Sequence, residues 1–162
     1  RDLRIAQIYE GTNGIQSQDL IGRKTIKCEG AYLKAYIDEI RDFANQMDAE
    51  LNFIKDATLD AATELESVTQ FILEAAQENP NFANAVAVDY LHALGLLSFS
   101  YMFARIAEAA QDKSAPFYQA KINLAIYFVQ RVLPELPMRI SKIKAGADVI
   151  MRFSPEYFTQ QS

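Results

Sequence analysis

The chain has 162 residues, of which half are hydrophobic and 23% are charged, so it is long and apolar enough to fold around a core of its own. Its formal net charge of −5 argues against general nucleic-acid binding, which needs a basic surface. The single cysteine, Cys28, excludes an internal disulfide, and a reducing, cytoplasmic location is expected. No run of about 18 apolar residues occurs, so no membrane span is expected.

The first stretch, residues 1–24, contains the segment that looks built for chemistry, IYEGTNGIQ at positions 8–16. Its carboxylate, Glu10, follows an apolar and an aromatic residue and precedes two glycines. Apolar neighbours desolvate a carboxylate, which makes it a stronger base. Glycine lets the backbone approach a ligand closely. This segment is therefore the candidate catalytic site.

The same stretch resembles the C-terminal motif of the acyl-CoA dehydrogenases, at Arg1-Asp2, Ile5, Ile8, Tyr9-Glu10-Gly11-Thr12 and the tail from Asp19 to Arg23. Those enzymes are flavoproteins that introduce a trans α,β double bond into acyl-CoA thioesters. The resemblance implies that Glu10 is the base that removes the α-proton, while the β-hydrogen leaves as hydride to the flavin N5. It also implies that Tyr9 lies along the substrate and that Gly11 and Thr12 lie near the FAD.

Because the chain continues far beyond this motif, it is similar to larger members with an extra helical C-terminal domain, such as the 3-methylmercaptopropionyl-CoA dehydrogenase-like group. We predict that residues 1–29 are an arm that ends the catalytic domain and that residues 30–162 form a helical domain. The chain starts inside the motif, so we expect a fragment that is inactive alone and binds FAD weakly. We expect the arm, residues 1–24, to be poorly ordered or held by a partner chain. The resemblance implies a homo-oligomeric parent with electron-transfer flavoprotein or a similar electron acceptor.

After the arm, apolar residues at helical spacing predict a series of amphipathic helices. The first begins at Gly30 and breaks between Asn52 and Thr58, with apolar residues at Leu33, Ile37, Ile40, Ala44, Met47, Leu51 and Ile54. The second begins at a Thr58 cap and stops at Asn79-Pro80. The third, residues 80–112, is apolar nearly all round, which predicts a central, buried helix that includes Leu94.

The fourth helix starts after a Ser114 cap, and its pattern resumes over residues 136–150 after two prolines. Proline either kinks such a helix or divides it into two coaxial helices. Residues 153–162 form a tail whose Phe153, Tyr157 and Phe158 are expected to dock onto the body. No stretch alternates with period two, so no strand is predicted. The expected fold class is all-α: an antiparallel up-down four-helix bundle preceded by the N-terminal arm.

The remaining candidates have both an ordinary and a functional interpretation. A lone His92 or Cys28 lacks neighbours at ligand spacing, so we prefer structural roles for both and expect no metal site. The basic residues Arg23, Lys24 and Lys27 form either a solvated connector, which we prefer, or a contact to a phosphate of CoA or the cofactor. The competing function is a non-catalytic helical interaction module in which the YEGT sequence is incidental. An upstream flavin domain in the same gene would separate the two functions.

Overall fold

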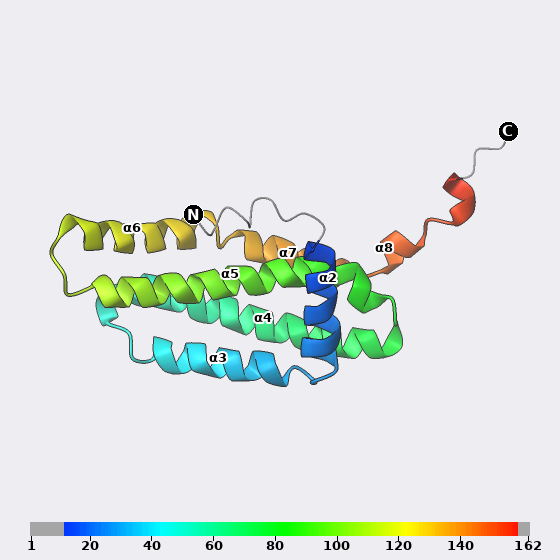
Figure 1. Ribbon diagram of the computed structural model, residues 1–162, viewed down its shortest axis with the longest axis horizontal. Coiled ribbons are helices and arrows are strands. Elements are labelled where there is room, and N and C mark those ends of the chain that lie inside the picture. Colours follow the sequence, from blue (N-terminus) through cyan, green and yellow to red (C-terminus); the bar gives the residue numbers. More distant parts are fainter. Residues whose placement is uncertain (1–11, 159–162) are drawn as a thin grey trace.

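The computed structural model describes residues 12–158, and every regular element in that part of the chain is helical (Figure 1). The all-α prediction is therefore confirmed there. The elements are α2 (Asn13–Gln18), the π-helix η2 (Asp19–Ile26), α3 (Ala31–Ala44), the short 3-10 helix η3 (Ala49–Leu51), α4 (Asn52–Glu78), α5 (Phe82–Ala110), α6 (Pro116–Arg131), α7 (Glu135–Ala145), α8 (Asp148–Met151) and the 3-10 helix η4 (Pro155–Phe158).

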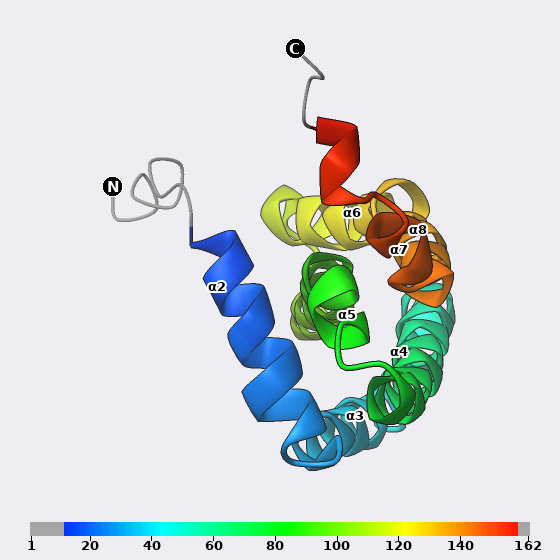
Figure 2. The same ribbon diagram turned by 90° about the vertical axis from the view of Figure 1, so that its right-hand side faces the viewer.

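The central element is α5, a helix of 29 residues that packs against α2, η2, α4, α6 and α7. Viewed along α5, the other helices curve around it and leave an opening between α2 and α6 (Figure 2). Its buried residues cover a wide sector of the helix, as a central helix requires: Val86, Tyr90, Ala93, Leu97, Tyr101 and Ala104 lie on one side, and Ala87, Leu96, Ser100 and Ala107 flank them. Leu94 is half-buried against the same core. The prediction of a central, buried helix is confirmed.

The helix α5 is also the one described helix that is long and apolar enough to cross a membrane. This signal carries little weight, because the core helix of a folded domain has the same length and composition.

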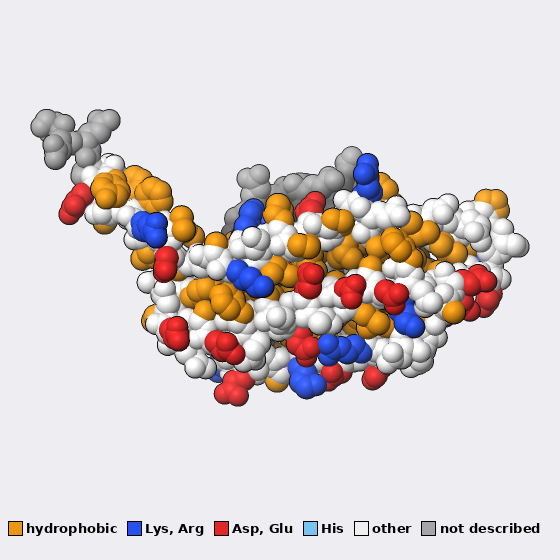
Figure 3. Space-filling view, turned by 180° about the vertical axis from the view of Figure 1, so that it is seen from behind, with side chains coloured by type: hydrophobic (Ala, Val, Ile, Leu, Met, Phe, Trp, Pro, Cys, Tyr) orange, Lys and Arg blue, Asp and Glu red, His pale blue; other side chains and the backbone are white. Residues whose placement is uncertain are grey.

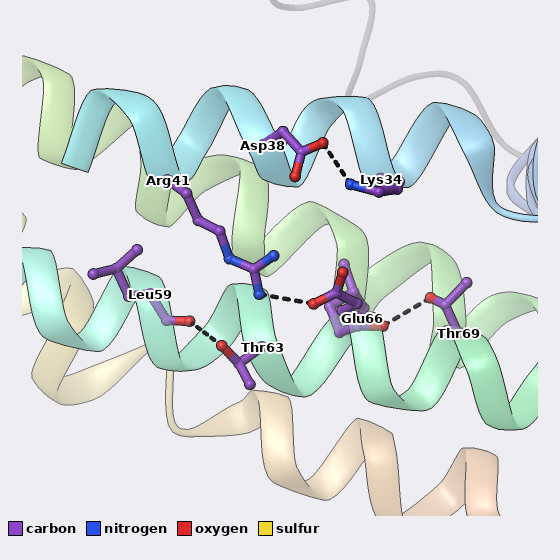
Figure 4. Close-up of polar contacts among 8 residues, drawn as sticks. Lys34, Asp38, Arg41, Leu59, Thr63, Glu66 and Thr69 are labelled. Atoms are coloured by element: carbon purple, nitrogen blue, oxygen red, sulfur yellow. Dashed lines mark hydrogen bonds and ion pairs between the residues drawn. The ribbon is translucent and has the colours of Figure 1, made fainter. Parts of the chain in front are cut away.

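The α3–α4 seam is held by apolar side chains with ion pairs at its edge (Figure 4). Ile37 and Ile40 of α3 are fully buried. Arg41 Nη2 lies 2.7 Å from Glu66 Oε2 of α4, and Lys34 Nζ lies 2.7 Å from Asp38 Oδ2 within α3. All four of these charged groups are at least one-third exposed, so their pairs contribute little to stability. The apolar stripe therefore carries this contact.

The first predicted helix ends earlier than its pattern indicates. It stops at Ala44, and Met47 and Leu51 remain buried although they lie in a turn and in η3. The turn is held by Asp48, whose Oδ1 accepts from the Glu50 N–H at 2.8 Å and whose N–H donates to Glu108 Oε2 at 3.0 Å. The break predicted between residues 52 and 58 is wrong, because these contacts place it before residue 52.

Thr58 is likewise not a cap, since α4 begins at Asn52. Thr58 is buried in the middle of α4, where its hydroxyl donates to the Ile54 carbonyl at 2.9 Å or pairs with Ser100 Oγ at 2.8 Å. The cap prediction failed because a buried threonine can satisfy its hydroxyl within the helix as well as at its end.

Prolines and glycines act differently at the remaining helix ends. The chain between α6 and α7 is divided at residues 132–134, which is the second of the two expected proline effects. The helix α7 then stops at Gly146, which has φ 68°, a left-handed conformation that favours glycine. Gly22 does not end a helix, although glycine often does so, because the chain continues helically through it to Ile26.

Candidate functional site

The predicted catalytic and binding residues Tyr9, Glu10 and Gly11 lie outside the described residues, so their roles stay predictions. Thr12 is described and immediately precedes α2. Its carbonyl accepts a hydrogen bond from Gln16 N–H at 2.9 Å, while its side chain makes no capping hydrogen bond. The Thr12 hydroxyl, on a half-buried residue, is therefore not committed to the helix that follows.

The helices α2 and η2 connect the motif to the body of the protein. Three of their residues, Ser17, Ile21 and Thr25, are at most 2% exposed. Ile21 joins the main hydrophobic core, and both helices pack on α5 (Figure 2). Within residues 12–24, this packing differs from the predicted arm, which was expected to be poorly ordered or held by a partner chain, because Ser17 and Ile21 belong to a buried face that packs on α5.

A cluster of three buried hydroxyl groups, which we call the Tyr90 hub, ties η2 to α4 and α5. The Tyr90 OH lies 3.0 Å from Thr69 Oγ1 and 3.4 Å from Thr25 Oγ1. Each threonine oxygen also lies close to a carbonyl of its own helix, 2.7 Å for Thr69 to Leu65 and 3.0 Å for Thr25 to Leu20. All three residues of the hub are at most 4% exposed, so their hydroxyl groups need these partners.

The electrostatics of the hub point to anchoring rather than to acid–base chemistry. Burial raises the pKa of Tyr90, and the hydrogen bonds from Thr25 and Thr69 act in the opposite direction. Tyr90 therefore stays protonated at neutral pH, and no charged group is among its hydrogen-bond partners. The sequence placed Tyr90 on a core face, but nothing in a linear pattern shows that two distant threonines meet it.

The basic cluster after the motif has partners within its own helix. Asp19 Oδ1 lies 2.9 Å from Arg23 Nη1, and Asp19 Oδ2 lies 3.4 Å from Lys24 Nζ. The Cys28 thiol lies 3.4 Å from the Arg23 carbonyl, within donating distance for sulfur. These contacts favour the connector interpretation over a phosphate site.

His92 is exposed on α5. Within residues 12–158, no three His, Cys, Asp or Glu side chains lie close enough together to share a metal ion.

A groove of about 520 Å³ runs between α4 and α7. It is lined by Thr63, Glu64, Ser67, Pro137, Ile140, Ser141 and Lys144. Figure 3 shows the face that carries α4, where acidic and basic side chains surround apolar ones. The lining offers one carboxylate, one ammonium group and short hydroxyl groups, without a nucleophile paired to a base, so the groove shows no catalytic arrangement.

Comparison with known proteins connects the chain to one family. Residues 36–154 match the family described as acetyl-CoA dehydrogenase C-terminal like. The chain is 32% identical to 3-methylmercaptopropionyl-CoA dehydrogenase of Ruegeria pomeroyi, over 95% of the chain and 28% of that protein. It is 27% identical to the broad-specificity linear acyl-CoA dehydrogenase FadE5 of Mycobacterium tuberculosis, over 98% of the chain and 28% of that protein. It is 30% identical to butyryl-CoA dehydrogenase of Syntrophomonas wolfei, over 83% of the chain and 24% of that protein.

Proposed function

The chain belongs to the acyl-CoA dehydrogenase family, in its acetyl-CoA dehydrogenase C-terminal-like group, and from this we propose that it serves an FAD-dependent oxidation of an acyl-CoA thioester to the trans-2-enoyl-CoA. The observation that carries the proposal is the Tyr9-Glu10-Gly11-Thr12 motif directly before a helix that is anchored to the family's domain. The chain spans less than a third of the length of the curated relatives it matches, so the whole enzyme's activity is part of this proposal.

In the proposed reaction, the Glu10 carboxylate removes a proton from the carbon α to the thioester. The α-carbon's electron pair forms the double bond as the β-hydrogen leaves with its own electron pair, and Glu10 becomes a carboxylic acid. Bound FAD would supply the acceptor for that hydride. The Thr12 hydroxyl, which caps no helix, suits a hydrogen bond to the flavin. Gly11 leaves room for the thioester, and Tyr9 lies along the acyl-CoA.

The Tyr90 hub has a positioning role in this proposal. A base must be held close to its proton, and a misplacement of about 1 Å can cost on the order of 100-fold in rate. The motif precedes α2, which continues into η2, and η2 is fixed by the buried Ile21 and by the Thr25 hydroxyl next to Tyr90. We propose that this anchor limits how far the motif can move relative to the bundle.

The wider organisation is also proposed. Residues 30–162 would be an antiparallel up-down four-helix bundle, with α6 and α7 together as its fourth member, that serves assembly or covers the active site. Residues 1–29 would complete the catalytic domain of the parent, and the isolated chain would be inactive. The parent would be a cytoplasmic homo-oligomer that passes electrons to electron-transfer flavoprotein or a similar acceptor.

The proposal is tested by replacing Glu10 with glutamine in the full-length parent. Glu10→Gln keeps the side-chain shape and removes the base. We expect the variant to retain its flavin and to bind acyl-CoA, while turnover falls by about 100-fold or more, the usual loss for a general base. Flavin absorbance and stopped-flow reduction by acyl-CoA measure both properties.

The matched control is Glu29→Gln, which changes an exposed carboxylate after η2 and should leave the rate of flavin reduction unchanged. Flavin reduction at the wild-type rate in Glu10→Gln would show that Glu10 is not the base. The alternative function, a non-catalytic helical interaction module, would then become the better explanation of the chain.

A further inference from the structure

The hydrogen-bond register changes between the two helices that connect the motif to the body. Register here means the number of residues between the N–H donor and the carbonyl acceptor along one helix. In α2 the register is four, because the Gln16 N–H donates to the Thr12 carbonyl at 2.9 Å. At the end of η2 it is five, because the Lys27 N–H donates to the Gly22 carbonyl at 3.0 Å. Such π-helical segments are rare and often occur at functional sites.

The side chains of η2 follow the same five-residue register. The Thr25 hydroxyl donates to the Leu20 carbonyl, five residues earlier, at 3.0 Å. The Cys28 thiol, just after η2, lies 3.4 Å from the Arg23 carbonyl, also five residues earlier. In a regular α-helix a threonine hydroxyl reaches the carbonyl three or four residues earlier. The Thr25 hydrogen bond is therefore specific to the π-helical conformation.

The threonines of α4 provide the contrast within the same molecule. Each of three donates to the carbonyl four residues earlier, at 2.7–2.9 Å: Thr58, Thr63 and Thr69. Figure 4 shows the hydrogen bond from Thr63 to Leu59. The threonine hydroxyl thus bonds to the carbonyl that belongs to the register of its own helix, and in η2 that carbonyl is Leu20.

The five-residue register keeps one row of buried side chains in line. Ser17, Ile21 and Thr25 are spaced by four residues and are at most 2% exposed. In an α-helix each four-residue step drifts by about 40°, so the third residue would lie about 80° from the first. A π-helix has more residues per turn, so the step from Ile21 to Thr25 turns back toward the starting direction. Thr25 therefore lies 3.4 Å from the Tyr90 OH while Ile21 is still buried in the core.

We propose that Thr25 is a positioning residue for the motif that contains Glu10: its hydroxyl, bonded to the Leu20 carbonyl, selects the five-residue register of η2. That register sets the rotation and the height of α2 relative to α5. A change by one residue moves α2 by about 1.5 Å along its axis and turns it by about 100°. A misplacement of about 1 Å can cost on the order of 100-fold in rate. The consequence for turnover rests on the proposed function, whereas the register itself does not.

This role is distinct from the anchoring by the Tyr90 hub. The hub fixes where η2 lies against α4 and α5, whereas the bond from Thr25 to Leu20 lies within η2. In the four-residue register the Thr25 hydroxyl would have to turn to the Ile21 carbonyl, and the drift would carry it away from Tyr90. Thr25 is 2% exposed, so its hydroxyl needs an acceptor within the protein. Both needs of this side chain are met in the π-helical register.

The first test reads the register directly in the 162-residue chain. Scalar couplings across hydrogen bonds, measured by NMR, identify the carbonyl that accepts each amide proton. In the wild type, the Lys27 N–H should couple to the Gly22 carbonyl. In Thr25→Val, which keeps the branched shape and removes the hydroxyl, it should couple to the Arg23 carbonyl instead. Thr25→Ser keeps the hydroxyl and should restore the coupling to Gly22. A Thr25→Val chain in which Lys27 stays coupled to Gly22 would overturn the proposal.

The matched control is Thr58→Val. Thr58 is also buried, and its hydroxyl also has a carbonyl of its own helix and a second hydroxyl, that of Ser100, as partners. This variant loses a comparable pair of contacts and should leave Lys27 coupled to Gly22. A register change in Thr58→Val would overturn the proposal, because general loosening of the core would then be its cause.

The second test measures flavin reduction by acyl-CoA in the full-length parent. Thr25→Val should lower the rate of flavin reduction about 100-fold, since the base is displaced by more than about 1 Å. The affinity for acyl-CoA should change less than about two-fold, as for a contact that matters only in the transition state. Thr25→Ser should recover most of the rate, and Thr58→Val should keep it. Loss of stability alone would slow Thr58→Val as much as Thr25→Val, and that result would overturn the positioning role.

A deletion decides the question if Thr25→Val does not fold. Deleting Gly22 brings Leu20 to four residues before Thr25, the α-helical spacing, and turns the motif by about 100° relative to the hub. Flavin reduction should then fall at least about 100-fold. An unchanged rate would overturn the proposal.

The control for the deletion is Gly22→Ala, which keeps the length of η2. Apart from the chain neighbours of Gly22 and the backbone of its own helix, no atom of residues 12–158 lies within 4 Å of the place where this Cβ would stand. The rate should therefore change less than about two-fold, as for a surface substitution without new contacts.

The results for Glu10 and Thr25 separate the two proposals. If Glu10→Gln abolishes flavin reduction and Thr25→Val does not slow it, the positioning role fails and the proposed oxidation stands. If Glu10→Gln leaves the rate unchanged, the proposed oxidation fails, and the NMR couplings still decide whether Thr25 selects the register.

Discussion

At the scale of single residues, the Tyr90 hub is a cluster of hydrogen-bonded hydroxyl groups inside the core. Tyr90 is fully buried, and its OH lies between hydroxyls from two other helices. When a mutation removes one partner of a buried hydrogen bond, the loss of stability is largest if the other partner is left with no hydrogen bond at all. Both threonine hydroxyl groups retain a carbonyl acceptor when the Tyr90 OH is absent. Loss of the OH alone should therefore cost less stability than loss of the whole side chain, which leaves a cavity.

Tyr90→Phe should therefore lower the free energy of unfolding by about 0.5–1.5 kcal/mol, the net value of a typical hydrogen bond. Tyr90→Ala should cost about 3–5 kcal/mol, because it also leaves a large cavity. Tyr32→Phe is the control, since Tyr32 is 66% exposed and the change should stay within about 0.5 kcal/mol. Urea unfolding followed by circular dichroism gives all three values. Equal losses for Tyr90→Phe and Tyr90→Ala would contradict this account.

The same residue predicts an alkaline limit to stability. Burial raises the pKa of Tyr90 above its ordinary value of 10.0, so the folded state holds its proton more tightly than the unfolded state. The contribution is complete below about pH 10 and is lost as the pH rises from 10 toward the raised pKa. Wild-type stability should fall more steeply above pH 10 than that of Tyr90→Phe. Parallel slopes in urea unfolding across pH 9–11 would show that Tyr90 does not contribute.

At the scale of the elements, glycine has different roles at different positions. Gly95 lies inside α5, and apart from its chain neighbours and the backbone of its own helix, no atom of residues 12–158 lies within 4 Å of the place where a Cβ would stand. Gly30 precedes α3 with φ 74°, and a Cβ there would lie 3.4 Å from the Leu73 side chain. A side chain should therefore help the helix at Gly95 and strain the backbone at Gly30.

Gly95→Ala should raise the free energy of unfolding by about 0.8–1.0 kcal/mol, the difference in helix propensity. Gly30→Ala should lower it by roughly 1–2 kcal/mol, the cost of a left-handed conformation for a residue with a Cβ. Thermal and urea unfolding of the two variants provide the comparison. A loss of stability in Gly95→Ala would indicate an unseen neighbour close to that side of α5.

At the scale of the whole molecule, η2 belongs to the packed body although the sequence assigns it to an arm. Ile21 is 1% exposed, and Leu20 and Ile26 pack against the main core. Burying a large aliphatic side chain fully contributes about 1.5–3 kcal/mol. The predicted boundary between residues 29 and 30 therefore divides a hydrophobic core.

A chain that begins at residue 30 should be less stable than the 162-residue chain by at least about 2 kcal/mol, since it loses Ile21 and uncovers Tyr90. Urea unfolding of both chains measures the difference. A chain of residues 12–162 is the control, because it removes the motif and keeps both helices that cover α5. If the chain from residue 30 kept full stability, the boundary at 29/30 would stand as an independent folding boundary.

The amino-acid sequence by itself determined the helical class, the central position of α5 and the resemblance of the first stretch to one enzyme family. These properties are local: apolar spacing sets the buried face of a helix, and a motif is a string of neighbouring residues. The family assignment agrees with the proteins that the chain matches. The roles of Tyr9, Glu10, Gly11 and Thr12 remain predictions that the full-length enzyme must test.

The tertiary structure alone decided the rest, because these features depend on contacts between residues far apart in the chain. The Asp48 N–H donates to Glu108 of α5, and this contact holds the turn at which α3 stops before its apolar pattern does. Thr25, Thr69 and Tyr90 meet only because η2 crosses α5 beside α4. The prediction that Phe153, Tyr157 and Phe158 dock onto the body is wrong. They are at least 62% exposed, because the C-terminal segment leaves the body at Gly146 beside Phe82 and points away from it.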